Sequence, residues 1–144
     1  MKTRNEIILI LKEKGLKVTP QRISILSAVY KLGNHPGAEK VIESIREEFP
    51  NIASGTIYKV LDTFVNNGIL HKVKTEAGIM RYDSEPETHH HLYCSESDRI
   101  EDYFDKELDG ILKNYFANKN IPNFSIEDVK LQIKGRFQKR KSKK

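Results

Sequence analysis

The sequence predicts an α+β protein, with a winged helix-turn-helix in its first half and a small α/β domain in its second. Apolar residues follow a helical period through the first part of the chain and then change to the period of strands. The charge changes as well. Residues 1–82 carry 13 Lys and Arg against 8 Asp and Glu (net +5), residues 83–133 carry 5 against 12 (net −7), and residues 134–144 carry 7 against none (net +7). A basic first half attracts polyanions, whereas the acidic segment suits cations or a partner subunit.

Local signals delimit the first two predicted helices. Apolar residues recur within Asn5–Lys14, and Gly15 is a typical helix stop. Thr19 followed by Pro20 predicts an N-cap and a proline at the first helical position of a second helix, which ends near Gly33.

Two further helices and a hairpin complete the first predicted domain. A third helix follows the turn at residues 34–37 and ends before Pro50. Ser54 is the expected cap of a fourth helix, which Asn67-Gly68 ends, and its inward-facing residues are Ile57, Val60, Leu61 and Phe64. Residues 69–74 and 79–82 then predict two strands joined by a turn at residues 75–78. This order of elements is that of a winged helix-turn-helix.

The remainder predicts a small α/β unit. Its expected elements are a strand at His89–Cys94, a strand at Arg99–Phe104, a helix at Asp105–Asn118 and a strand at Asp128–Ile133. Pro86 and the acids around it interrupt the apolar pattern. We therefore predict domains at residues 1–83 and 84–134, followed by a basic tail at residues 135–144. The tail is interpreted as a solvating end, with added nonspecific DNA affinity as the alternative.

The sequence lacks signals for a membrane or an oxidising compartment. No stretch approaches the roughly 18 apolar residues of a membrane span, and the N-terminus has no cleavable apolar region. We therefore expect a cytoplasmic protein without membrane partners. Cys94 is the single cysteine, which excludes an intrachain disulfide and a structural zinc site built from four cysteines of one chain.

The fourth predicted helix is the candidate DNA-reading element. Its outward face offers Ser54, Thr56, Tyr58, Lys59, Asp62 and Thr63. Hydroxyl groups and a cation suit phosphates and base edges in a major groove. Further phosphate contacts are expected from Arg22, Lys72, Lys74 and Arg81. A merely solvated helix face is the alternative, but the position of this helix in the helix-turn-helix-wing order favours double-stranded DNA as a partner.

Histidines and carboxylates form a second candidate site. His89 and His91 point to one face of a predicted strand because side chains alternate along strands, whereas His90 points to the other. Asp83 ends the preceding predicted strand, and Asp102 lies on the next one, so both carboxylates could approach these histidines. His35 would join them from the first domain. Three imidazoles and two carboxylates suit Fe(II), Mn(II) or Zn(II). The fifth histidine, His71, is interpreted as structural, and exposed polar residues are the alternative for the histidine run.

Together these features resemble the ferric uptake regulator (Fur) family of bacterial repressors. The resemblance covers nearly the whole chain, and its order and spacing make chance agreement improbable. The matching stretches are Val18–Arg22, His35-Pro36, Ser54–Leu61, Gly68–Leu70, Arg81–Asp83, His89–His91 and Arg99–Asp102.

Membership of that family implies a metal-dependent repressor that acts as a homodimer on a pseudo-palindromic operator, with Tyr58 near the bases and the second domain forming the dimer. It also implies a regulatory metal bound by residues matching His35, Asp83, His89, His91 and Asp102. Aspartates at positions 83 and 102 resemble the peroxide-sensing branch (PerR), whereas iron-sensing members tend to have glutamates there. In that branch bound Fe(II) reacts with peroxide and oxidises a ligating histidine, here His35 or His89.

The chain departs from many family members at a structural zinc site. Those relatives hold it with two Cys-x-x-Cys pairs, whereas here the first pair reads Cys94-Ser95-Glu96-Ser97 and the second is absent. Dimerisation is therefore expected to depend on the sheet and its apolar residues. A second family metal site maps onto His90, Asp109 and Asp128, with Thr88 at the remaining ligand position.

Three other functions remain open on the sequence. An iron, manganese or zinc uptake regulator would use the same ligands without sensing peroxide. A winged-helix regulator that senses no metal is the second alternative. A metal-dependent hydrolase would need an open coordination position and a nearby base, and the chain has carboxylates but no nucleophile motif or phosphate-binding glycine loop. We accordingly expect no enzymatic activity.

Overall fold

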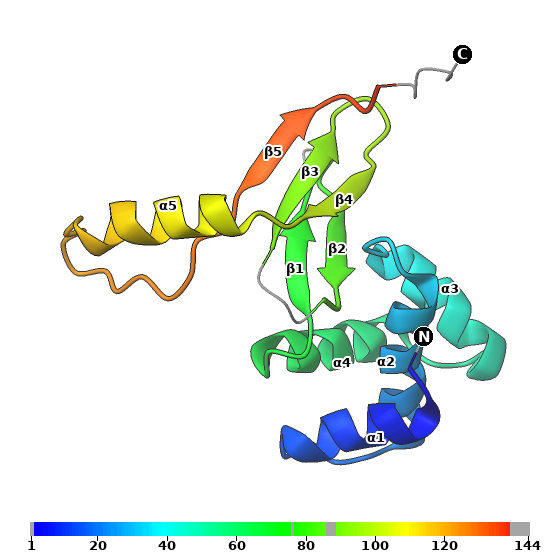
Figure 1. Cartoon of the computed structure of the whole chain (residues 1–144). Helices are drawn as coiled ribbons and strands as arrows, with labels where there is room; N and C mark the ends of the chain where they lie inside the picture. The colour runs from blue at the N-terminus through cyan, green and yellow to red at the C-terminus, as the bar shows by residue number, and fades with distance from the viewer. Residues whose placement is uncertain (1, 76, 86–88, 139–144) are drawn as a thin grey trace. The chain divides into compact units, whose positions relative to one another are not determined.

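A computed structural model describes residues 2–75, 77–85 and 89–138, and it divides into two compact units, Met1–Pro86 and Glu87–Lys144 (Figure 1). The predicted limits of residues 1–83, 84–134 and 135–144 stay a prediction, and most of the basic tail lies outside the described residues. None of the described helices has the length and apolar character needed to cross a membrane.

The first unit has the winged helix-turn-helix order that the sequence predicts. Its elements are α1 (Arg4–Glu13), α2 (Pro20–Leu32), α3 (Ala38–Glu48), α4 (Ser54–Asn66), β1 (His71–Lys74) and β2 (Met80–Asp83). Strands β1 and β2 form an antiparallel hairpin in which Lys72 lies opposite Tyr82. The backbone N–H of Tyr82 donates to the carbonyl of Pro36, so the segment between α2 and α3 joins the hairpin.

The helix starts follow the capping signals with one exception. Thr19 accepts a hydrogen bond from the backbone N–H of Arg22, with Pro20 at the first helical position, as expected. Thr3 and Glu6 form a capping box before α1, which the sequence analysis did not use. The expected cap at Ser54 is wrong, because Ala53 occupies the N-cap position of α4 without a side-chain hydrogen bond. The Ser54 hydroxyl instead accepts from the Arg46 guanidinium at 2.7 Å.

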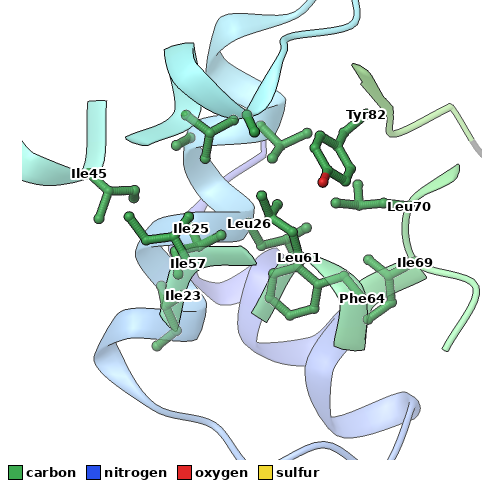
Figure 2. Packing of buried hydrophobic residues seen from close by; sticks show 14 of the residues in the cluster. Ile23, Ile25, Leu26, Ile45, Ile57, Leu61, Phe64, Ile69, Leu70 and Tyr82 are labelled. Atoms are coloured by element: carbon green, nitrogen blue, oxygen red, sulfur yellow. The ribbon is translucent and has the colours of Figure 1, made fainter. Parts of the chain in front are cut away.

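The core of this unit collects the apolar faces of its helices and the hairpin. Figure 2 shows Leu26, Leu61 and Phe64 side by side with Leu70 and Tyr82. Leu26, Leu61, Phe64 and Leu70 are completely buried, and Tyr82 is 2% exposed. Because interiors are close-packed, this core fixes the direction in which α4 presents its outer face.

The second unit is a small sheet with one helix. Its elements are β3 (His90–Cys94), β4 (Ile100–Tyr103), α5 (Lys106–Ala117) and β5 (Gln132–Gly135). The strand order is β4-β3-β5, with β3 antiparallel to β4 and parallel to β5 (Figure 1). The last strand begins four residues later than the predicted Asp128–Ile133. Pairing with β3 sets the register of this strand and places Gln132 opposite His91.

Two leucines of α1 test the core. Leu11 is completely buried and Leu9 is 56% exposed. We expect Leu11→Ala to lower the free energy of unfolding by about 2 to 5 kcal/mol, because it removes buried methyl groups and leaves a cavity. The matched control Leu9→Ala should change it by less than about 0.5 kcal/mol. Urea denaturation followed by circular dichroism measures both, and equal effects would contradict the packing described here.

Candidate metal centre

The first unit contributes one histidine and one carboxylate. Gly33, Asn34 and His35 all have positive φ, at 58°, 48° and 55°, so the chain turns sharply after α2 and brings His35 beside the end of β2. Its Nε2 lies 3.8 Å from Oδ2 of Asp83, and the two residues are 8% and 3% exposed. The Arg81 guanidinium donates to the His35 carbonyl at 3.2 Å, which ties this turn to the hairpin.

The second unit contributes two histidines and one carboxylate. His91 lies directly opposite Asp102 in the β3–β4 pair, and His89 lies two residues before it, on the same face. Oδ1 of Asp102 lies 3.2 Å from Nε2 of His89 and 3.7 Å from Nε2 of His91. The imidazole centroids are 4.8 Å apart with an interplanar angle of 76°. His89 is completely buried and His91 is 5% exposed, whereas the Asp102 side chain is 27% exposed, so two buried nitrogens meet one oxygen of a half-buried carboxylate.

This arrangement fits a divalent metal. The ligand atoms of His89, His91 and Asp102 lie within 4.8 Å of one another. A small cation can bind all three if the side chains move slightly closer together. Imidazole nitrogen and carboxylate oxygen are ligands of Fe(II), Mn(II) and Zn(II). His89, His91 and Asp102 alone would leave coordination positions of a bound metal open. The pair of His35 and Asp83 would leave still more. Neither set by itself makes the five-ligand site predicted from the sequence.

The residues of the predicted second metal site behave differently. His90 and Asp109 do meet, with Nε2 and Oδ1 2.6 Å apart. The exposed Asp128 carboxylate accepts a hydrogen bond from the backbone N–H of Val129. Within the described ranges, the only group of three or more possible ligands is the one containing His89, His91 and Asp102, so Asp128 does not join His90 there. Thr88 lies outside the described residues.

The predicted DNA-binding residues lie on the first unit, mainly on α4 and the hairpin. Tyr58 is 39% exposed, and Thr56, Lys59 and Lys74 are exposed too. Two of the predicted cations have partners within the protein. Lys72 forms a 3.0 Å ion pair with Asp62 of α4, and the Arg22 guanidinium donates to the carbonyl of Lys17.

One contact at the start of α4 was missed by the sequence analysis. The guanidinium of Arg46, an exposed residue on α3, lies at Ser54 and adds a cation there. No local sequence signal pairs residues eight apart on two different helices, so only the fold reveals this contact.

Cys94 is buried at the position where many relatives have the first Cys-x-x-Cys pair and this chain has a single cysteine. A hydrogen bond with the Ser97 side chain, assisted by the backbone at Phe137 and Ser97, lowers the pKa of the Cys94 thiol to about 7. The segment that would carry a zinc-binding pair thus holds a single thiol that is hydrogen-bonded to Ser97 and to nearby backbone groups.

The fold and the site together define a class of protein. A basic winged helix-turn-helix is typical of DNA-binding proteins, and the buried histidines with Asp83 and the half-buried Asp102 suit a regulatory metal. Comparison with known proteins makes the class specific. The ferric uptake regulator family model matches residues 13–134, and the chain belongs to this family. It is therefore a transcription regulator.

Individual relatives agree with this assignment. The peroxide-responsive repressor PerR of Staphylococcus saprophyticus is 27% identical over 125 residues, covering 87% of this chain and 82% of the relative. The structure of the Campylobacter jejuni peroxide stress regulator has a TM-score of 0.69 at 27% identity, covering 93% of this chain and 98% of that one. The fold also matches the Helicobacter pylori ferric uptake regulator Fur, with a TM-score of 0.75 at 20% identity and coverage of 94% and 92%.

Two neighbouring carboxylates on β4 test the metal centre. Asp102→Ala should weaken Mn(II) binding by more than about 10-fold, because loss of a ligand should exceed the loss of a ligand's hydrogen-bond partner. Glu101 pairs with Arg99 and does not belong to the ligand group, so Glu101→Ala removes the same charge without this effect. Titration of free Mn(II) by electron paramagnetic resonance measures both. Equal affinities in the two variants would exclude Asp102 as a ligand.

The Cys94 thiol predicts a pH effect. We expect its thiolate absorbance near 240 nm to rise with a midpoint at about pH 7, and Ser97→Ala to move that midpoint upward. Because the folded-state pKa lies below that of an unfolded thiol, the thiolate stabilises the fold fully above the unfolded pKa, and this stabilisation is lost as the pH falls through about 7. Cys94→Ser provides the baseline, and a wild-type midpoint near 9 would contradict the described hydrogen bonds.

Proposed function

We propose that this protein is a metal-dependent transcriptional repressor whose divalent metal is held by His35, Asp83, His89, His91 and Asp102. The observation that carries the proposal is the convergence of Nε2 of His89 and Nε2 of His91 on one carboxylate oxygen of Asp102. Burial of such polar groups is costly unless they are hydrogen-bonded or bind an ion. The buried pair of His35 and Asp83 supplies the remaining two ligands.

The proposed ligand set couples the metal to DNA affinity. His35 and Asp83 belong to the winged-helix unit, and the other three ligands belong to the second unit. One metal that takes ligands from both would restrict how the units move and so fix the spacing of two recognition helices in a dimer. The metal then favours the DNA-binding form by the difference in its affinity for the two forms, typically about 1 to 3 kcal/mol.

The partners follow from the family and from the exposed surface. Family regulators of this kind bind operators as dimers, and we propose a homodimer on a pseudo-palindromic site, with Tyr58 facing the bases. In the second unit, apolar side chains that a monomer would leave in water include Ile111, Tyr115 and Phe124, which are 58%, 55% and 66% exposed. Large apolar side chains left exposed in one unit are compatible with an interface between subunits. They support the proposal of dimerisation through this unit without a structural zinc.

The aspartates at positions 83 and 102 favour peroxide as the signal. The named relatives include peroxide-responsive regulators at 27% identity, from Staphylococcus and Campylobacter. Hydrogen peroxide would be the two-electron oxidant: one of its oxygens would be added to a ring carbon of His35 or His89, and the other would leave as water. Fe(II) held by the five residues would supply the chemistry that activates peroxide. An oxidised imidazole would bind the metal more weakly, which would favour release of the metal. An uptake regulator for iron, manganese or zinc would use the same residues without this oxidation.

His35 tests the coupling to DNA. In the wild-type protein, metal should strengthen operator binding by roughly 5-fold to 150-fold, the range that corresponds to the coupling above. We expect His35→Ala to retain the affinity of the metal-free protein and to lose most of this gain, because the metal then keeps only Asp83 of its two proposed ligands in the first unit. Fluorescence anisotropy with Mn(II), Fe(II), Zn(II) or a chelator measures the effect.

A matched control lies on the DNA-reading helix. Tyr58→Phe removes only a hydroxyl at an exposed position, so it should change operator affinity while leaving the ratio between the metal and chelator conditions intact. Equal operator affinity of the wild-type protein with metal and with chelator would overturn the proposed metal dependence.

Peroxide sensing predicts a covalent change. After treatment with Fe(II) and hydrogen peroxide, peptides containing His35 or His89 should gain the mass of one oxygen, and the protein should leave its operator. Mn(II) in place of Fe(II) is the control, since it should protect both histidines. Mass spectrometry of digested protein reads the change. Protein that stays unmodified and bound to DNA would identify a regulator of metal uptake instead.

A further inference from the structure

His90, the first residue of β3, lies between the proposed ligands His89 and His91 but faces the other side of the sheet, where both of its ring nitrogens are engaged. Its Nδ1 accepts a hydrogen bond from the backbone N–H of Leu131 at 3.0 Å. Its Nε2 lies 2.6 Å from Oδ1 of Asp109 on α5. The imidazole is completely buried. One side chain of β3 therefore contacts both the helix and the segment that leads into β5.

These contacts determine which nitrogen carries the proton. Nδ1 accepts from an N–H group, so it carries none, and the ring proton is on Nε2, where it is donated to the carboxylate of Asp109. Leu131 is bound on both sides, because its carbonyl accepts from the backbone N–H of His91 at 3.0 Å. The His90 ring thus satisfies a backbone donor one residue before the parallel β3–β5 pairing begins at Gln132.

We infer that His90 and Asp109 form a metal-free clasp that positions the proposed metal ligands His89 and His91 at the start of β3, an inference that rests on the proposed function. Rotation of β3 about its axis would move His89 and His91 away from Asp102, but it would also break both hydrogen bonds of His90. The clasp resists that rotation from the opposite face of the strand. Functional side chains need such support to stay within about 0.5 Å of their working geometry.

The clasp also explains why these residues do not make a second metal site. A metal on His90 would have to displace either the Leu131 N–H or the proton shared with Asp109. Asp128, the third candidate ligand, is exposed and does not join His90 in a ligand group among the described residues. His90 is therefore a positioning residue, and the part of the chain that the structure describes offers one ligand group for a regulatory metal.

The first arm of the test examines the ring itself. Nitrogen-15 spectra of histidine-labelled, metal-free protein, assigned with His90→Gln, should show His90 protonated at Nε2 and unprotonated at Nδ1. Asp109→Ala should perturb the Nε2 signal of His90, whereas Glu107→Ala should not. Glu107 is the matched control because it is the other acidic residue in the first turn of α5. A proton on Nδ1 in the wild-type protein would overturn the clasp.

The second arm measures Mn(II) affinity by electron paramagnetic resonance. Asp109→Ala should weaken binding by roughly 3-fold to 10-fold, which is less than the roughly 10-fold to 100-fold typical of a group bonded directly to a ligand. Asp109→Asn should recover part of the loss, because its amide oxygen still accepts from Nε2, and Glu107→Ala should bind as the wild-type protein does. Circular dichroism confirms that each variant is folded.

The outcomes separate this inference from the proposed function. If the wild-type protein binds one Mn(II) and Asp109→Ala binds it equally well, the clasp does not position the ligands, while the proposed function stands. Two Mn(II) ions per wild-type chain, with one lost in Asp109→Ala, would make His90 a ligand and overturn the inference. A wild-type protein that binds no divalent metal contradicts the proposed function and, with it, the positioning role.

Discussion

The convergence of two buried imidazoles on one carboxylate oxygen is the constraint on which the second unit depends. His91 lies on β3 and His89 immediately precedes this strand, and their Nε2 atoms lie 3.7 Å and 3.2 Å from Oδ1 of Asp102. Two buried imidazole nitrogens and a half-buried carboxylate form a ligand set that suits the proposed divalent cation. Much of the surrounding architecture, including the β3–β4 register, can be understood as holding these atoms in place.

The first unit prepares its own ligands by a different route. Three successive residues with positive φ turn the chain after α2, and the carbonyl of Pro36 then pairs with the N–H of Tyr82 on β2. The same strand ends in Asp83. A displacement of His35 or Asp83 therefore acts directly on the hairpin, and through the shared core on α4, because Tyr82 belongs to the same hydrophobic cluster as Leu61 and Phe64 (Figure 2). This connection gives the proposed metal a physical route to the proposed DNA-reading helix.

Much of this organisation could be predicted from the sequence because it is encoded locally. Apolar spacing predicted the helices, alternation along a strand predicted that His89 and His91 share a face, and Thr19-Pro20 marked the start of α2. Contacts between distant residues could not be predicted in this way. The start of β5 depends on pairing with β3, and the Ser54–Arg46 contact joins two helices. The role of His90 depends on Asp109 and Leu131, which are brought to it only by the fold.

The central claim is that one metal takes ligands from both units. Nitrogen-15 spectra of histidine-labelled protein test it most directly, because metal coordination changes the chemical shift of the ligating ring nitrogen. On addition of one equivalent of Zn(II), the account predicts that the coordinated nitrogens of His35, His89 and His91 shift together, while His90 keeps its protonated Nε2. A shift confined to His89 and His91, with His35 unchanged at full occupancy, would contradict it.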